Sequence, residues 1–397
     1  MNSGLAEKRS FIVVLGLLSG LVATSIDMSL PAIPGMVRDL ATSMSLGQQT
    51  IGLFMAGIAI GQLPAGLLSD RLGRMPVLYA GMGIFVLSGV VASVSDNIHT
   101  LLMARLAQGV GVSAGMVVSR AIIRDIASGA TAARLMSLQL MIFTAAPMFA
   151  PMIGSFLVTH WGWRAPFFVL VILGIMAAIG IRVVLQETHI PGRDHHILRQ
   201  LIMSLKEFFS HRRSIFGAIL VFLPACGFMS LISGSSALVI EIYGYPVEYF
   251  GFIFALSGVS ILTGSVANRR LLLRFAPMQV MGVGAGLVGI AAAQMLLITW
   301  LADVPFWWVW GSACLYMFGI SFLMPNATAL ALDPVPGIAG VAASIMGTIQ
   351  GIAASFSAIA GGFLYDGTIT NITTLMGVAG SMTFAAFLLR KLILGNK

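Results

Sequence analysis

Two ionisable side chains lie inside long apolar stretches of this sequence. Asp27 is about four residues before the end of stretch 11–31, and Arg105 is about six residues into stretch 99–122, so helices at 1.5 Å per residue place both at similar depth. Ionisable groups within a membrane are costly and by default line a cavity and pair. A carboxyl group holds a proton in an apolar setting and releases it when an arginine approaches. The pair predicts a proton-coupling site; the alternative is an acid at the outer interface and an arginine bound by carbonyl groups.

The elements that must position these charges are membrane-spanning helices. Apolar residues make up 58% of the 397 residues, charged residues make up 9%, and the mean hydropathy is +0.97. A bilayer core of ~30 Å needs about 20 apolar helical residues per crossing. Twelve stretches meet this length: 11–31, 48–68, 77–95, 99–122, 135–158, 165–186, 214–236, 249–267, 277–300, 305–325, 338–362 and 372–390. The sequence therefore predicts an all-α membrane protein.

The net charge of +8 follows the membrane topology. If the N-terminus is cytoplasmic, nearly all lysines and arginines outside the spans fall in the inner loops, and only Arg38 and Arg164 fall in the outer ones. This is the positive-inside bias expected for an even number of spans with both termini inside. The basic charge is thereby explained without a nucleic-acid partner.

A charged segment, Gly66–Arg74, separates the second and third stretches. Asp70, Arg71 and Arg74 are expected in a short loop leaving the lipid, where all three stay hydrated. Gly73 permits a left-handed backbone at low steric cost. Pro76 suits a first helical position, because its missing N–H would have no partner there.

A weaker copy of this segment, Gly264–Arg274, follows the second span of the other half; Gly264 and Asn268 have the same offset as Gly66 and Asp70, and Arg269 matches Arg71. Repeats of this kind predict two parallel six-helix bundles related by a pseudo-twofold axis along the membrane normal, with substrate held at mid-membrane between them. The domains expected are a bundle at 1–186, an inner loop at 187–213 and a bundle at 214–397. Within that loop, Ile197–Phe209 alternates apolar and basic residues, which predicts a short helix on the inner membrane surface.

With these residues in view, the chain resembles a major facilitator superfamily transporter over its whole length. Within it, the chain is most similar to the drug:proton antiporter branch and the bicyclomycin/chloramphenicol-resistance type of exporter. Four motifs carry the resemblance: Gly66-x-x-x-Asp70-Arg71-x-Gly73-Arg74, the run Asp27–Pro34, the run Arg105–Gly111, and Ala146–Pro151 with Gly154. Met75 is a departure, since the family loop usually has another base there. Ser19 replaces a second acid that some drug exporters carry.

The resemblance implies a proton-coupled exporter of small amphipathic molecules, such as drugs or antibiotics, that works by alternating access in the bacterial inner membrane. Besides the bilayer, the partners implied are protons and a small-molecule substrate, and the protein is expected to act as a monomer. The implied inner gate comprises Gly66, Asp70, Arg71, Gly73 and Arg74. The implied bundle-interface hinge comprises Pro147, Pro151 and Gly154, with an ordinary kinked helix as the alternative.

The expected substrate cavity combines residues of both halves: Asp27, Gln108, Phe222, Phe228, Met317, Phe318 and Asn326. Gln108 either binds substrate or holds the side chain of Arg105, one helical turn away. The glycines beside it, Gly109 and Gly111, are interpreted as sites of close helix packing.

No catalytic residues, cofactor or metal site are predicted. Cys226 and Cys314 lie in apolar spans, and His195-His196 lies in a loop where a solvated segment explains it better than a metal site. Paired catalytic carboxylates, nucleophile elbows and phosphate loops are absent from the sequence, so an enzyme is not expected. The alternative function is proton-coupled or passive transport of a specific metabolite, such as an amino acid, a siderophore or a sugar.

Overall fold

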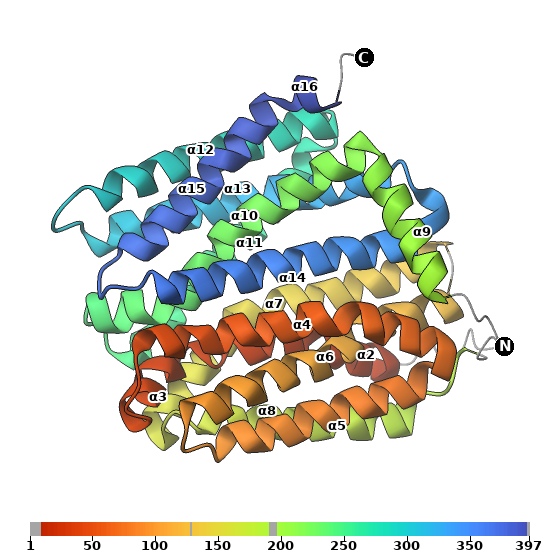
Figure 1. The fold of residues 1–397 in the computed structure, drawn as a ribbon, viewed down its shortest axis with the longest axis horizontal. Coiled ribbons are helices and arrows are strands. Elements are labelled where there is room, and N and C mark those ends of the chain that lie inside the picture. Colours follow the sequence, from red (N-terminus) through yellow and green to blue (C-terminus); the bar gives the residue numbers. More distant parts are fainter. Residues whose placement is uncertain (1–8, 128, 190–196, 395–397) are drawn as a thin grey trace. The chain divides into compact units, whose positions relative to one another are not determined.

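The computed structural model describes residues 9–127, 129–189 and 197–394, and the regular structure within these ranges is helical (Figure 1). Twelve helices of at least 19 residues occur in this described part, one for each apolar stretch. They are α2 (Arg9–Asp27), α4 (Met44–Leu72), α5 (Arg74–Ser93), α6 (Ile98–Ile126), α7 (Gly129–Trp161), α8 (Ala165–Val184), α10 (Arg212–Ser236), α11 (Val247–Leu271), α12 (Pro277–Thr299), α13 (Phe306–Leu332), α14 (Ala339–Phe363) and α15 (Thr370–Leu388). Eleven segments of the described residues have the length and hydropathy of a membrane span.

Shorter elements link or flank these helices. They are η1 (Leu30–Ala32), α3 (Ile33–Asp39), α9 (Ile197–Ser210), the π-helical η2 (Ala237–Ile242), η3 (Pro336–Ile338) and α16 (Arg390–Leu394). The helix predicted at Ile197–Phe209 is confirmed as α9, which lies at a steep angle to the adjoining α10 (Figure 1). Phe208 of α9 is fully buried against the core that contains Phe216, while Phe209 is exposed. Its place on a membrane surface stays a prediction.

The chain divides into two compact units. The first contains residues 1–197 and 246–252, and the second contains residues 198–245 and 253–397. Each unit has its own core: in the first, Trp163 and Phe167 pack with Leu101, and in the second, Phe216 packs with Leu323.

Glycines allow the helices of the first unit to approach closely. A Cβ atom on Gly57 would lie 2.1 Å from the carbonyl oxygen of Leu106, and one on Gly109 would lie 2.1 Å from that of Phe54. A Cβ on Gly111 would meet the carbonyl oxygen of Gly81 at 2.6 Å. Small residues at helix contacts let backbones touch in this way. The packing interpretation of Gly109 and Gly111 is therefore confirmed.

Glycines also allow close helix packing in the second unit, where Gly264 occupies the position that Gly61 occupies in the first. A Cβ on Gly264 would meet Phe318 and Ser321 of α13, and one on Gly61 would meet Val110 and Ser113 of α6. The two pairs of contacts have the same spacing, so Gly264 corresponds in packing to Gly61. Since Gly61 precedes Gly66 by more than one helical turn, the sequence match of Gly264 with Gly66 is wrong in register.

Candidate functional site

The junction between α4 and α5 is shorter than the sequence suggested. Helix α4 continues to Leu72 and α5 begins at Arg74, so Gly73 alone links them. Gly73 has φ +98°, which confirms the expected left-handed conformation. The prediction that Pro76 opens the next helix is wrong, because Pro76 is the third residue of α5. Asp70 and Arg71 accordingly lie in the last turn of α4, and the loop that was expected to hold them is helical.

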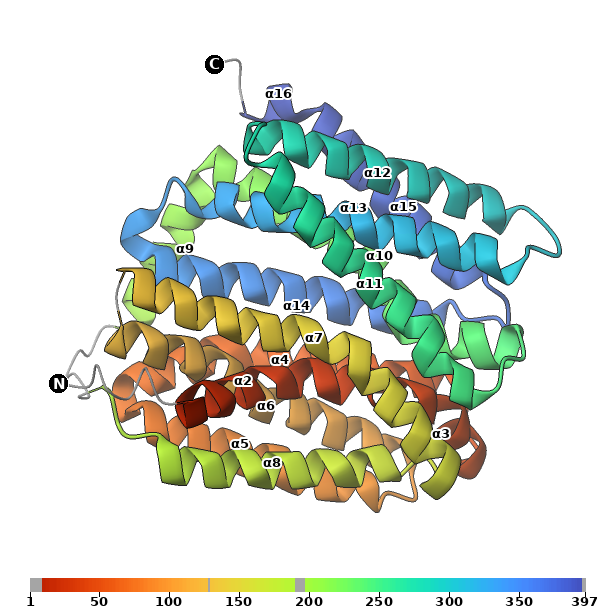
Figure 2. The same ribbon diagram turned by 180° about the vertical axis from the view of Figure 1, so that it is seen from behind.

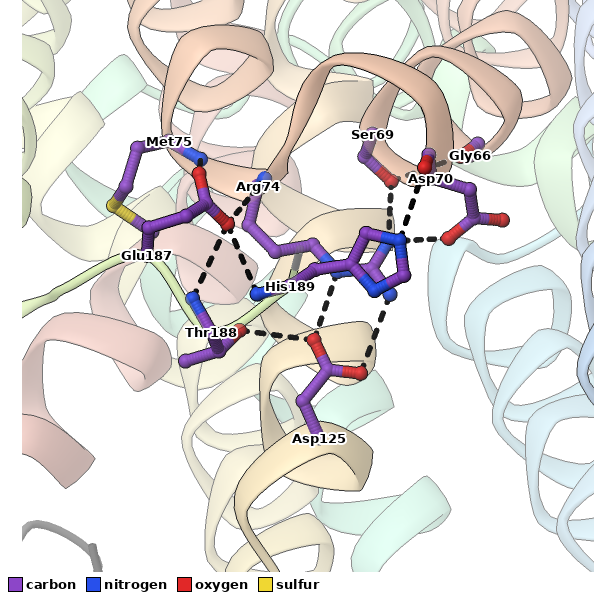
Figure 3. Close-up of polar contacts among 9 residues, drawn as sticks. All are labelled: Gly66, Ser69, Asp70, Arg74, Met75, Asp125, Glu187, Thr188 and His189. Atoms are coloured by element: carbon purple, nitrogen blue, oxygen red, sulfur yellow. Dashed lines mark hydrogen bonds and ion pairs between the residues drawn. The ribbon is translucent and has the colours of Figure 1, made fainter. Parts of the chain in front are cut away.

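The start of α5 is capped by a carboxylate distant in the sequence, that of Glu187 (Figure 3). The N–H of Arg74 donates to its Oε1 at 2.8 Å, and the N–H of Met75 donates to its Oε2 at 3.0 Å. The next residue, Pro76, has no N–H to satisfy. The first N–H groups of a helix lack intrahelical partners and favour negative charge. Glu187 therefore supplies this helix end with both hydrogen-bond acceptors and a negative charge.

Glu187 also orders its own segment, which follows α8. Its Oε1 accepts the N–H groups of Thr188 and His189, both at 3.2 Å. Burial favours a higher pKa, but these four backbone donors outweigh it and hold the pKa of Glu187 below its usual value. At neutral pH the cap is therefore a charged carboxylate.

Two further contacts attach this segment to α4 and α6. The Thr188 hydroxyl donates to Oδ2 of Asp125 at 2.9 Å. The Nε2 of His189 lies 3.0 Å from the carbonyl oxygen of Asp70, so this nitrogen must donate. Segment 187–189 thereby binds one end of α4, α5 and α6 together.

Arg74 occupies the centre of this network (Figure 3). Its Nε donates to Oδ2 of Asp125 at 2.9 Å and its Nη2 donates to Oδ1 at 3.2 Å, a two-point contact. Its Nη1 donates to Asp70 and, at 2.9 Å, to the Ser69 hydroxyl. The Arg74 side chain is 6% exposed, against 57% for Asp70. Arg74 is thus a nearly buried base held by two acids.

The remaining gate candidates have lesser roles in this network. The carbonyl of Gly66 accepts the Ser69 hydroxyl at 2.8 Å. Arg71 is exposed, and the structure records no ion pair for it within the described ranges. The gate predicted from the sequence included neither Asp125 nor Glu187. A signal was nevertheless present in the sequence. Asp125 and Glu187 each closely follow a predicted span, on the side where most of the lysines and arginines are expected.

Arg105 is fully buried at the level of Asp27 but contacts another face of α2. Its Nη2 donates to the carbonyl oxygen of Ser25 at 3.0 Å and to the Ser29 hydroxyl at 3.4 Å. Its guanidinium carbon lies 4.3 Å from the centre of the Phe54 ring. Ser25 and Ser29 each lie two residues from Asp27, about 200° around the helix. The arginine is therefore bound by a carbonyl group, as in the alternative interpretation.

Asp27 itself is 3% exposed, and the described residues offer its carboxyl group no recorded hydrogen bond or ion pair. Gln108 is fully buried, and its Oε1 accepts Nη1 of Arg105 at 2.7 Å. Of the two roles considered for Gln108, holding the arginine is the one that the geometry supports. Pairing of Asp27 with Arg105 stays a prediction.

The proline segment of α7 packs closely on its neighbours within the first unit. Pro147 and Pro151 both lie inside the helix. A Cβ on Gly154 would come within 2.3 Å of the carbonyl oxygen of Met28. Residues 246–252, which belong to this unit, approach from another element: the N–H of Gly251 donates to the Ser155 hydroxyl at 3.1 Å. A hinge role for this segment stays a prediction.

Comparison with known proteins identifies the family. Residues 15–358 match the model of the Major Facilitator Superfamily, which is most of the chain. The chain belongs to the Major Facilitator Superfamily. It is 30% identical to the bicyclomycin resistance protein homolog of Haemophilus influenzae, covering 86% of this chain and 85% of that protein. It is 28% identical to multidrug resistance protein D of Escherichia coli K12, covering 93% of each.

Solved structures of the superfamily share the fold. A D-xylose–proton symporter superposes with a TM-score of 0.76 at 17% identity, covering 96% of both chains. The expected all-α membrane fold and the expected resemblance are thus confirmed. The protein is a multi-pass membrane transporter of the Major Facilitator Superfamily, and it is not an enzyme.

The cavity candidates of this superfamily member fall in different units. Asp27 and Gln108 belong to the first unit, and the other five belong to the second. Met317 is 1% exposed, whereas Phe222, Phe228 and Phe318 are half-buried. Asn326 is buried, and its Nδ2 donates to Oδ1 of Asn268 at 2.9 Å and to the carbonyl oxygen of Phe322 at 2.7 Å. Asn326 therefore uses its donor group inside its own unit.

Proposed function

We propose that this transporter exports small amphipathic drugs in exchange for protons. Two named relatives support this proposal: a bicyclomycin resistance protein homolog and a multidrug resistance protein, each covering more than four fifths of the chain. The bacterial inner membrane, with both termini in the cytoplasm, is the location that suits such an exchange. The cytoplasmic placement of the termini is supported by the distribution of basic residues.

The observation that carries the proposal is the buried acid Asp27 at the end of α2, the same helix end that a fixed arginine, Arg105, contacts on another face. A buried carboxyl group without a protein partner favours its neutral, protonated form. Arg105 is held at the same end of α2 by the carbonyl group of Ser25 and by the hydroxyl of Ser29, which follows the helix. A rearrangement at this end of α2 that brought the carboxylate to the guanidinium would favour loss of the proton. Proton binding and release at Asp27 would thus follow the change between two states.

The proposed moving bodies are the two six-helix bundles, 1–186 and 214–397, joined by the loop 187–213. Alternating access requires each to move as a unit around a central site. The network around Arg74 supports this role in the first bundle, because it binds the ends of α4, α5 and α6 to one another. We assign it as the inner gate, with Pro147, Pro151 and Gly154 as the hinge against the other bundle.

The proposed substrate cavity contains Asp27, Gln108, Phe222, Phe228, Met317, Phe318 and Asn326. Aromatic and methionine side chains suit varied apolar ligands, because they offer broad, adaptable contact surfaces. Asp27 would then be shared between substrate and proton, so that one leaves as the other binds.

Transport by purified protein in proteoliposomes tests the proposal, with bicyclomycin as the first probe and an interior pH dye as the second readout. The wild type should concentrate the probe when a pH gradient is imposed, with protons flowing in the opposite direction. Asp27→Asn should lower gradient-driven uptake at least tenfold while equilibrium exchange of the probe persists. The matched control is Asp303→Asn, an exposed acid in a turn, which should behave as wild type.

Two outcomes would overturn the proposal. If Asp27→Asn still concentrates the probe against its gradient, then Asp27 is not the coupling residue. If the wild type carries substrates across the membrane without proton flow, then the protein is a passive transporter. A panel of compounds tested in a strain that lacks its own efflux pumps would extend the search for the substrate.

A further inference from the structure

A groove of about 690 Å³ runs between α11, α12 and α13 of the second unit. These helices can be followed in Figure 2. All of the groove's lining residues belong to the second unit, whereas Asp27 and Arg105 belong to the first. Six of its lining residues define it: Val266 and Arg270 of α11, Val283 and Leu287 of α12, and Phe318 and Phe322 of α13.

The groove is long and apolar along most of its length. On α11 the lining residues recur at 262, 266 and 270 and at 263, 267 and 271, so they form one face of the helix. At 1.5 Å per residue this face extends about 13 Å along the helix axis. Phe318 and Phe322 line the α13 side, with ring centres 5.1 Å apart. The shape suits an extended hydrocarbon chain.

One end of the groove carries positive charge. Arg270 lines it there, and Arg269 and Arg274 lie close by in the sequence, all three of them exposed. The structure records no ion pair for any of the three within the described part of the chain. From residue 253 onward the sequence has only Asp303, Asp333 and Asp366 as acids, and Asp333 pairs with Arg213. The positive charge at this end is therefore not neutralised by a described carboxylate.

We propose that this groove binds one anionic phospholipid, with its phosphate on Arg270 and one acyl chain along α11. Basic pockets between transmembrane helices bind anionic head groups in this manner. Val266 and Val283 are 53% and 49% exposed and belong to helices long and apolar enough to cross a membrane, so the groove opens on a surface that lipid can reach. A free anion in water would match Arg270 but not the apolar walls. A phospholipid matches both features of the groove, since its phosphate suits Arg270 and its acyl chain suits the apolar walls.

Lipid titration of the purified, delipidated full-length protein tests the assignment. The probes are phosphatidylglycerol and phosphatidylcholine with the same acyl chains, and the readouts are the number of lipids retained in native mass spectrometry and the shift in melting temperature. Phosphatidylglycerol should bind more tightly, with one copy retained most strongly. Arg270→Gln should weaken that copy roughly fivefold, the factor expected for one basic residue near an anionic lipid.

Matched variants separate the groove from general surface charge. Arg212→Gln removes an exposed arginine elsewhere in the same unit and should leave the tightest copy unchanged. Val266→Trp fills the groove and should release that copy, whereas Val259→Trp, on the same helix but outside the groove, should retain it. Because both tryptophan variants add an exposed ring to α11, a folding defect would affect the two alike and would appear in their melting temperatures.

Three results would overturn the proposal. Equal binding of the two lipids would exclude a site for the anionic head group. Equal weakening by Arg270→Gln and Arg212→Gln would assign the effect to net charge. A wild-type dimer that Val266→Trp converts to a monomer would show that a second copy of the chain, and not a lipid, covers the groove.

Discussion

The two helix junctions that the sequence repeat relates, α4–α5 and α11–α12, are built in different ways. At α4–α5 a single residue, Gly73, joins the helices, and α5 is capped by Glu187 from beyond α8. At α11–α12 the link runs from Leu271 to Pro277, and the cap is local: the side chain of Gln279 accepts the N–H of Ala276 at 3.0 Å. The first-position proline expected at Pro76 occurs here instead, at Pro277. The helix cap at the α4–α5 junction thus comes from a segment distant in the sequence, whereas the cap at the α11–α12 junction comes from the helix itself.

The arginines at the two junctions also differ, in how deeply they are buried. Arg74 is nearly buried between Asp70 and Asp125, so its charge is used inside the first unit. Arg270 and Arg274 are exposed, and their charge faces outward. A local cap stabilises only the helix that carries it, whereas a remote cap couples that helix to whatever moves the remote segment. The remote cap links the first junction to the segment after α8, whereas the exposed arginines of the second junction are available to the anionic lipid proposed above.

The largest effect should come from removing the central base, by Arg74→Ala. The change leaves Asp125 and Asp70 without their shared partner, and breaking a buried charge pair costs about 3 kcal/mol. The matched variant at the second junction, Arg274→Ala, removes an exposed base and should cost less than about 0.5 kcal/mol. Thermal unfolding in detergent gives the stabilities, and proteoliposome transport gives the activity.

Two other outcomes of this experiment would contradict the proposed difference between the α4–α5 and α11–α12 junctions. If Arg74→Ala and Arg274→Ala destabilise the protein equally, the two junctions are equivalent despite their contacts. If Arg74→Ala folds with wild-type stability and transports normally, then the network is a plain turn and the inner gate lies elsewhere.

An intermediate effect is expected from Gly73→Ala. The residue has φ +98°, and an added Cβ would lie 2.6 Å from Oε2 of Glu187. Backbone strain and displacement of the cap together should cost about 2 kcal/mol. The control is Gly83→Ala in α5, where a Cβ meets nothing within 4 Å and the helix should gain or lose little.

A double-mutant cycle separates the cost of backbone strain at residue 73 from the cost of displacing the Glu187 cap. In a Glu187→Ala background the added Cβ no longer meets the carboxylate, so Gly73→Ala should cost about 1 kcal/mol less than in the wild type. Strictly additive losses would mean that Gly73 serves the turn alone and that its contact with Glu187 has no energetic role. Both measurements use thermal unfolding under the same conditions.

The helices and the conformation of the linking glycine were accessible from the sequence, because apolar length and glycine conformation are local properties. The twelve stretches and the left-handed Gly73 are examples. Glu187 and Asp125 were not selected, because their partner Arg74 lies 113 and 51 residues away, respectively. The register of Gly264 was misjudged for a related reason: matching letters at equal offsets do not reveal which turn of a helix packs on its neighbour. Long-range pairing is set by the bundle, which the sequence pattern does not encode directly.

The smallest predicted effect concerns pH and the cap of α5. In the folded protein the pKa of Glu187 is lowered, since its backbone donors outweigh burial. A group with a lowered pKa contributes stability that is present above the unfolded value, about 4.3, and that is lost as the pH falls through the folded value. Glu187→Gln should therefore cost about 1 kcal/mol at pH 7, and that difference from the wild type should persist to about pH 5 and shrink below about pH 4.

Melting curves of both proteins in the same detergent, from pH 7 to pH 3, check this effect. Since the two proteins differ only at residue 187, the difference between their curves reports on that residue. The matched change at the second junction, Gln279→Ala, removes a cap that does not titrate, so its cost should stay level across the range. If the Glu187→Gln difference is also level down to pH 3, the cap acts by shape and not by charge. If it disappears by pH 6, Glu187 is not held as a carboxylate by α5, and the contrast between a remote charged cap and a local neutral one fails.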